Sequence, residues 1–238
     1  MHHELLELAH WAGNHPERWV LGGEGSIAAK RPEGGLVMNR SQTWLSRLDE
    51  SALAVLDADQ TRALIREVDE LPPASPAELD APPPPSDWVP SPQAWLLADL
   101  FATFEDVCFA LHTQPVAVNQ ILCSPRARQF SDRRNLPFEV VTCGSASVLI
   151  PFVMPGPGLA KEVRRKLVLW RDRYKETPKL ILFQNHGMMA LGSSAEEVRR
   201  VTAMAVKSAE VFVGAAMMGG PEFLKPNFVA QIDATKWC

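Results

Sequence analysis

The sequence contains no apolar run long enough to cross a bilayer, although 46% of its 238 residues are hydrophobic. Its N-terminal segment, Met1-His2-His3-Glu4-Leu5, has neither the basic region nor the apolar core of a secretory signal. We therefore expect a cytoplasmic protein with no membrane partner. A basic excess is also absent, because the formal net charge is −4. Since nucleic-acid binding needs a basic face, we expect no nucleic-acid partner.

Cysteine is scarce as well: the chain has four, and no two of them form a CxxC pair. This argues against a zinc knuckle and favours buried, reduced thiols. The charged fraction of 22% is typical of a globular protein, and the length is sufficient to bury a sizeable core. We expect a single domain over residues 1–238.

One segment, at about residues 71–92, is rich in proline and includes four consecutive prolines, Pro82 to Pro85. Polyproline cannot join a sheet and prefers an extended, solvated form. No complete core precedes this segment, so we interpret it as an exposed excursion from one domain rather than as a domain boundary.

Hydrophobic periodicity predicts short strands interleaved with helices. The predicted helices are Leu5–Ala12, Leu64–Leu71, Ser91–Phe104, Leu159–Tyr174 and a capped helix from Ser194 to about Ala216. The predicted strands are Ile27–Lys30, Leu36–Met38, Ala52–Leu56, Val107–Leu111, Phe138–Thr142, Ser147–Phe152, Leu180–Phe183 and Met188–Leu191. Hairpin signals at both ends of this series favour an α/β fold with a mixed sheet between helices, rather than an all-parallel sheet.

Two of the six histidines, His112 and His186, directly follow short apolar strands, where rigid scaffolds present reactive groups. They could share a site, or each could be a hydrogen-bonded core residue, and the residues alone leave both hypotheses open. A catalytic zinc takes three protein ligands. The next candidate is Gln114, whose amide oxygen is a poor zinc ligand. Residue chemistry therefore indicates a weak or absent metal site.

Several motifs resemble those of the class II aldolase/adducin family. Its HxH motif is similar to His112-Thr113-Gln114, and its NHG motif is similar to Asn185-His186-Gly187. Its glycine-rich GGNxSx[RK] stretch resembles Gly22 to Lys30, and its PSxE segment resembles Pro90-Ser91-Pro92-Gln93. The resemblance extends from Trp19 to about Pro221 and is nearest to a bacterial branch without an assigned role.

The resemblance implies a three-layer α/β/α sandwich with a central mixed, mostly antiparallel sheet. It implies a divalent metal, with zinc favoured by family chemistry. It also implies a carbon–carbon lyase of the aldolase type that acts on a small sugar phosphate or hydroxy-carbonyl compound of carbohydrate metabolism. It also implies a homo-oligomer, with a tetramer favoured. The residues implicated are His112, His186 and Gln114 for metal, and Gly25, Ser26 and Ser91 for substrate.

The departures from the family pattern fall on the chemistry. Gln114 replaces the middle histidine of HxH, and Gln93 replaces the glutamate that moves the proton. Glutamine cannot take up and return a proton at neutral pH. The single tyrosine, Tyr174, lies on a predicted helix far from these motifs.

Three hypotheses follow from these departures. The first is a diverged metal-dependent aldehyde-lyase. The alternative is a non-catalytic, adducin-like binding or assembly module without metal, and a third is a sugar-phosphate binder without turnover. The apolar stretch Val211 to Met218 suits either an oligomer interface or the core side of a helix.

Overall fold

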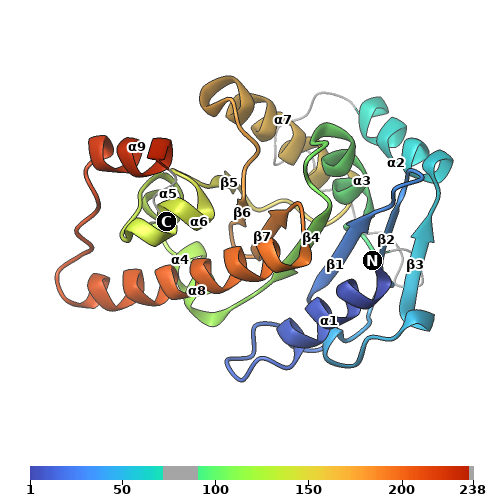
Figure 1. The fold of residues 1–238 in the computed structure, drawn as a ribbon, viewed down its shortest axis with the longest axis horizontal. Coiled ribbons are helices and arrows are strands. Elements are labelled where there is room, and N and C mark those ends of the chain that lie inside the picture. The colour runs from blue at the N-terminus through green and yellow to red at the C-terminus, as the bar shows by residue number, and fades with distance from the viewer. Residues whose placement is uncertain (72–90, 236–238) are drawn as a thin grey trace.

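A computed structural model describes residues 1–71 and 91–235. Strands from these residues form one seven-stranded sheet in the order β3-β2-β1-β4-β7-β6-β5 (Figure 1). The strands are β1 Ser26–Lys30, β2 Leu36–Asn39, β3 Leu53–Leu56, β4 Phe109–Thr113, β5 Val148–Ile150, β6 Leu180–Phe183 and β7 Gly187–Gly192. Only the β5–β6 pair is parallel among them, so the sheet is mixed and mostly antiparallel.

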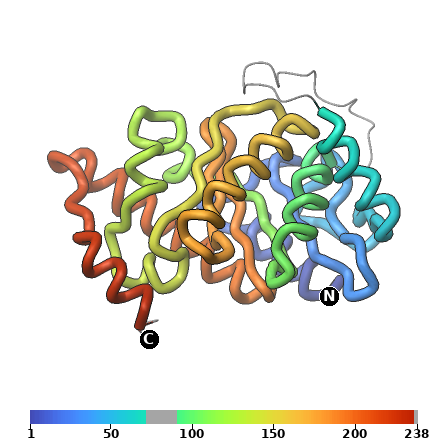
Figure 2. The backbone as a smooth tube through the Cα atoms, turned by 90° about the horizontal axis from the view of Figure 1, so that it is seen from above, coloured from blue at the N-terminus to red at the C-terminus, as the bar shows by residue number. Residues whose placement is uncertain are grey.

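Helices cover both faces of the sheet, which confirms the predicted three-layer sandwich. The helices are α1 His2–Gly13, α2 Ala58–Glu70, α3 Ala94–Thr103, α4 Val116–Leu122, α5 Ala127–Asp132, α6 Pro137–Cys143, α7 Pro157–Tyr174, α8 Ala195–Met217 and α9 Pro226–Thr235. Helices α2, α3 and α7 lie above the sheet in Figure 1 and form the near layer in Figure 2. The other core is made chiefly by α1, α4 and α8.

The two cores follow from the alternation of side chains along each strand. In β4, Ala110 packs into the core under α3 and α7, whereas Phe109 and Leu111 pack into the core under α1 and α8. Strands with both faces covered have near-continuous apolar sequences, as Leu180 to Phe183 does. The sheet is therefore a rigid platform on which strand ends can position polar groups.

The predicted strand Phe138–Thr142 is wrong, because these residues belong to helix α6. Its branched residues fit either structure, and contacts at the helix start decide between them. Pro137 occupies the first turn of the helix, where its missing N–H does no harm. The Glu139 carboxylate also accepts hydrogen bonds from the backbone N–H groups of Asn135 (2.8 Å) and Leu136 (3.3 Å).

The helix predicted from Ser91 begins later, at Ala94. Ser91 is therefore not its N-cap; its hydroxyl accepts a hydrogen bond from the Gln93 backbone N–H at 3.3 Å instead. The short helices α4, α5 and α9 were not predicted. Residues 72–90 of the predicted proline-rich excursion lie outside the described residues, and the single-domain assignment stays a prediction.

No helix in the described ranges combines the length and the apolarity that a membrane span requires. Helix α8 comes nearest in length, with 23 residues. Its side chains alternate between buried apolar residues, such as Val201 and Phe212, and charged residues such as Arg200 and Lys207. That pattern is typical of a helix packed with one face on a sheet.

The central position of β4 predicts a large difference between two apolar truncations. Leu111→Ala, at a fully buried residue of β4, should lower the free energy of unfolding by about 2–5 kcal/mol, because it leaves a cavity. Val55→Ala on the edge strand β3, where the side chain is 49% exposed, should cost less than about 1 kcal/mol. Urea denaturation followed by circular dichroism measures both, and equal losses would contradict this assignment of the core.

Candidate active site

Residues that are far apart in the sequence come together where the central strands β1, β4 and β7 meet one end of the sheet, which we call the site edge. Ser26, the first residue of β1, lies directly opposite His112 of β4 in the antiparallel register. His112 in turn lies opposite Met189 of β7, and β7 begins immediately after His186. The predicted site residues on β1, β4 and the β6–β7 turn therefore meet at this edge.

The β6–β7 turn is built for a close approach to β4. Asn185 (φ 59°) and Gly187 (φ 82°) both adopt left-handed backbone conformations, which asparagine and glycine tolerate best. A Cβ atom on Gly187 would lie only 2.4 Å from the Thr113 carbonyl oxygen, so no other residue fits without a shift of the backbone. The NHG sequence thus sets His186 against the end of β4.

A chain of hydrogen bonds runs through this edge. The Ser26 hydroxyl donates to the Gln93 Oε1, and the Gln93 Nε2 lies 3.3 Å from the His112 Nδ1. The His112 Nε2 lies 2.8 Å from the His186 backbone carbonyl oxygen. A carbonyl only accepts, so the neutral His112 ring carries its proton on Nε2 and accepts at Nδ1 from Gln93. Each hydrogen bond then runs the same way, from the Ser26 hydroxyl to Gln93, from Gln93 to His112, and from His112 to the His186 carbonyl.

Burial keeps both imidazoles neutral. Burial, with a smaller contribution from the neighbouring His186, lowers the pKa of His112 from 6.5 to about 3. The backbone carbonyls of His186 and Glu24 act in the opposite sense, because they favour a protonated ring. Burial also lowers the pKa of His186. No charge is therefore available on either ring at neutral pH.

A pocket of about 310 Å³ opens over this edge. Its lining residues are Gly23, Glu24, Gly25, Ser26, Asn39, Arg40, Ser41, Gln42, Ser91, Pro92, Gln93, Gln114, Pro155 and His186. Six of the seven site residues expected from the sequence are in this lining. The seventh, His112, is 1% exposed and lies beneath the pocket rather than in its wall.

Sequence reasoning missed the polar residues at and after the end of β2, of which Asn39 is the most consequential. The buried Asn39 Oδ1 accepts from the Ile27 N–H at 2.8 Å, and its Nδ2 donates to the Thr43 hydroxyl at 3.1 Å. Asn39 thereby ties the loop at Gly25 to the segment Arg40–Gln42. An asparagine at the end of an apolar strand, followed by a polar run, is the signal that could have identified it.

The donor set does not fit the divalent metal that the motifs imply. The His112 and His186 rings are close, with centroids 5.0 Å apart. A histidine binds metal through a ring lone pair, yet His112 donates from Nε2 to a carbonyl and accepts at Nδ1 from Gln93. Within residues 1–71 and 91–235, no group of three or more histidine, cysteine or acidic side chains could hold an ion. One free imidazole and neutral amides are a weak ligand set.

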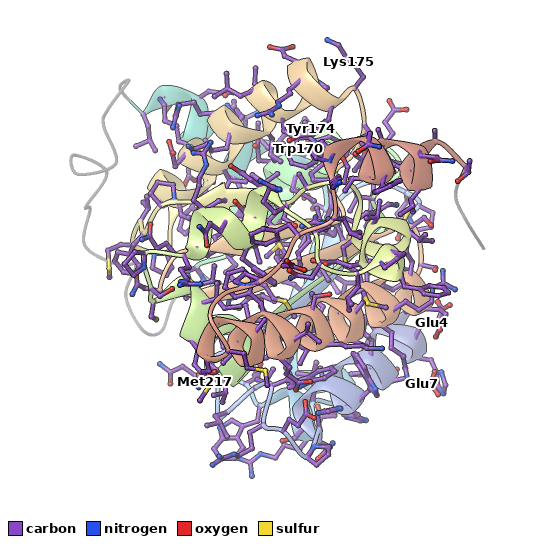
Figure 3. The ribbon with its side chains drawn as sticks, turned by 90° about the vertical axis from the view of Figure 1, so that its left-hand side faces the viewer. Glu4, Glu7, Trp170, Tyr174, Lys175 and Met217 are labelled. Atoms are coloured by element: carbon purple, nitrogen blue, oxygen red, sulfur yellow. The ribbon has the colours of Figure 1, made fainter. Side chains whose placement is uncertain are left out.

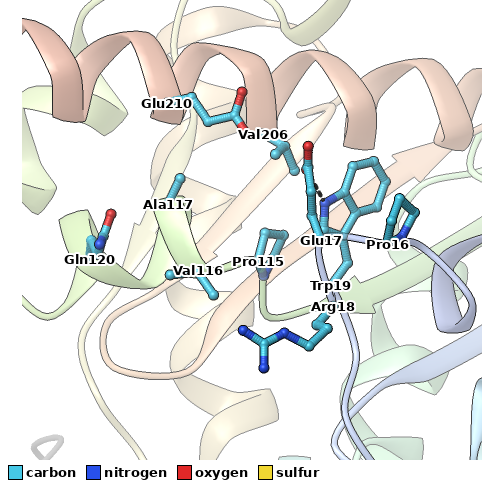
Figure 4. Close-up of a pocket in the computed structure, with 10 residues that line it drawn as sticks. All are labelled: Pro16, Glu17, Arg18, Trp19, Pro115, Val116, Ala117, Gln120, Val206 and Glu210. Atoms are coloured by element: carbon cyan, nitrogen blue, oxygen red, sulfur yellow. Dashed lines mark hydrogen bonds between the residues drawn. The ribbon is translucent and has the colours of Figure 1, made fainter.

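Two features lie outside this pocket. A second pocket, of about 340 Å³, shares none of its lining residues and is lined in part by Trp19, Glu17 and Pro115 (Figure 4). There the Trp19 indole N–H donates to the Glu17 carboxylate at 2.9 Å. Tyr174 stacks on Trp170 at the C-terminal end of α7 (Figure 3), about 25 Å along the helix from its start near Pro155. It therefore supplies no proton donor to the pocket.

Comparisons with known proteins agree with this architecture. Residues 3–213 match the family described as the Class II Aldolase and Adducin N-terminal domain. YgbL from Escherichia coli is 16% identical over 98% of this chain and 97% of its own, with a TM-score of 0.70. An L-fuculose 1-phosphate aldolase is 12% identical over 98% and 94%, with a TM-score of 0.71. The N-terminal class II aldolase domain of a Thermoplasma acidophilum protein is 21% identical over 88% and 92%, with a TM-score of 0.59. A search of functionally curated proteins finds no match.

Because His112 is neutral in the folded protein, we expect the free energy of unfolding to decrease in acid. Between about pH 3 and 6.5 the unfolded chain protonates this ring and the folded chain does not, so the unfolded state binds more protons. The free energy of unfolding should therefore fall as the pH drops from 6.5 toward 3, by up to about 1.4 kcal/mol per pH unit from this group. His112→Gln, which keeps a donor and an acceptor, should give a shallower pH dependence in urea titrations between pH 4.5 and 7.

The matched control is His3→Gln on the exposed face of α1, which should leave the slope of the wild-type protein unchanged. Identical slopes for His112→Gln and the wild-type protein would mean that the His112 ring is protonated in the folded state.

Proposed function

We propose that this chain, which belongs to the class II aldolase and adducin family by its match over residues 3–213, binds a small hydroxy-carbonyl or sugar-phosphate compound in the pocket over His186. We further propose that binding needs no zinc and that the metal-dependent lyase reaction of the family is not its activity. The observation that carries this proposal is the one-way hydrogen-bond chain from Ser26 through Gln93 and His112 to the His186 carbonyl.

This chain of bonds occupies the groups that a metal-dependent lyase would need. Gln93 stands where the family has its glutamate, and its amide N–H group points at the His112 lone pair instead of leaving that lone pair for an ion. Glutamine cannot move a proton, and the buried His112 stays neutral. What remains is a set of hydrogen-bonding groups suited to hydroxyl and carbonyl oxygens.

The pocket offers such groups at several points. We propose that Gly25, Ser26 and Ser91 contact the ligand, and that His186 faces it with a neutral ring. The His186 ring nitrogens make no hydrogen bond to another described residue, so they are free to bond ligand hydroxyls. Arg40 adds positive charge at the rim, which would favour a phosphate or a carboxylate on the ligand.

The family resemblance also supports a cytoplasmic homo-oligomer, with a tetramer favoured, and we propose both. The end of α8 is the surface that supports self-association. Met217 there is 84% exposed (Figure 3), and the following Met218 is exposed as well. Phe212, one turn and a half earlier, is buried in the core, so the stretch Val211 to Met218 divides between core and surface.

Binding and metal content together test the proposal. Protein purified without a histidine tag should retain well under one zinc per chain by mass spectrometry. It should still bind dihydroxyacetone phosphate in calorimetry with a chelator present, and Ser91→Ala should weaken that binding about tenfold. One tightly held zinc per chain, together with binding that the chelator abolishes, would favour the lyase. Absence of any binding would favour an adducin-like assembly module.

A double substitution tests the reason for the missing metal. Gln93, Gln114 and His186 all line the pocket, and a carboxylate at position 93 and a histidine at position 114 would each supply a metal ligand that the two amides lack. Gln93→Glu with Gln114→His should therefore raise zinc affinity at least tenfold over the wild-type protein. The matched control is Gln120→His with Gln129→Glu, at two exposed positions, which should give no gain. Equal affinities for the two variants would contradict the proposed cause.

A further inference from the structure

Gln114, at the wall of the pocket, is held at three points. Its backbone N–H donates to the Trp19 carbonyl oxygen at 2.8 Å. Its Cγ packs against Gly187, where an added Cβ would lie 2.8 Å away. Its side-chain Oε1 accepts from the Asn119 Nδ2 at 3.4 Å. The oxygen and nitrogen of an amide point in different directions, so fixing Oε1 leaves Nε2 as the free end of this side chain.

The environment of Asn119, the partner of Gln114, does not favour an asparagine on grounds of stability. It lies on α4, whose neighbouring residues Val118, Ile121 and Leu122 are buried in the core. Its Oδ1 is inaccessible and has no hydrogen-bond partner among the described residues. A buried acceptor without a partner costs on the order of 1–3 kcal/mol of stability. The compensating benefit of an amide here is its contact with Gln114.

We infer that Asn119 is a positioning residue, which turns the Gln114 amide so that its NH₂ group faces the pocket and donates to an oxygen of the ligand. This inference rests on the proposed function, because it specifies the chemistry of the same pocket. A carbonyl, carboxylate or phosphate oxygen satisfies such a donor. The reverse orientation would present Oε1, which suits a cation or a ligand that only donates. The amide pair thus selects ligands with an acceptor oxygen at this point.

The inference separates stability from binding. Asn119→Leu removes the unpartnered acceptor and keeps the branched shape of the side chain on a half-buried position, so the free energy of unfolding should stay the same or rise. Release of the Gln114 amide should nevertheless weaken dihydroxyacetone phosphate binding about tenfold in calorimetry. Gln114→Ala should weaken binding by at least as much. The double variant should be no weaker than Gln114→Ala, because Asn119 acts only through that side chain.

The adjacent, exposed Gln120→Leu is the matched control and should leave both stability and affinity unchanged. A loss of stability in Asn119→Leu, or additive losses of affinity in the double variant, would overturn the inference by showing an ordinary packing role.

A measurement without ligand keeps this inference distinct from the proposed function. Asn119→Asp can only accept, so it should draw the Gln114 NH₂ group out of the pocket and toward position 119. In ¹⁵N-edited spectra the Gln114 side-chain protons should then exchange with water more slowly than in the wild-type protein. Unchanged exchange would overturn the assigned orientation. If the wild-type protein binds no probe at all, the proposed function fails, and the exchange result alone decides the orientation.

Discussion

The contact on which the rest of the site depends is the hydrogen bond between the His112 ring and the backbone carbonyl of His186. A carbonyl oxygen can only accept, so the ring must carry its proton on Nε2, the nitrogen that faces it. Nδ1 must then be the acceptor, and the residue at position 93 must donate to it. A glutamine can do this and a carboxylate cannot. In this structure the backbone oxygen, set by the turn at Asn185 and Gly187, and the glutamine at position 93 therefore match in polarity.

The electrostatics of the pocket follow from that polarity. Without a carboxylate at position 93, the backbone carbonyls of His186 and Glu24 still favour a charged ring beneath the pocket, but burial outweighs them and the pKa of His112 falls to about 3. A divalent ion would meet the same environment, with one free imidazole and amides as ligands. The two glutamines are thus a consistent pair. Gln93 satisfies the ring inside the protein, and Gln114 offers a neutral donor to whatever occupies the pocket.

The interleaved strands and helices, together with the family motifs, were enough to predict the three-layer sandwich. His112 and His186 were expected near strand ends, and they come together because β4 pairs with β7, which begins directly after His186. Helix α6 was mistaken for a strand because Val140, Val141 and Thr142 suit both structures, and long-range packing with the bonds to Glu139 decided the outcome. Asn39 was missed because its role is to join two loops that are adjacent only after the sheet forms.

The direction of each hydrogen bond is a different kind of information from residue identity. Glutamine, asparagine and neutral histidine can all donate and accept hydrogen bonds. The same residues could therefore either bind a ligand or bond only to one another. The choice between these is made by a group with one fixed role, here the backbone carbonyl of His186. This carbonyl sets the tautomer of the His112 ring, and the ring in turn sets the orientation of the Gln93 amide. The hydrogen-bonding pocket that we propose for this chain therefore depends as much on that backbone carbonyl as on the identity of residue 93.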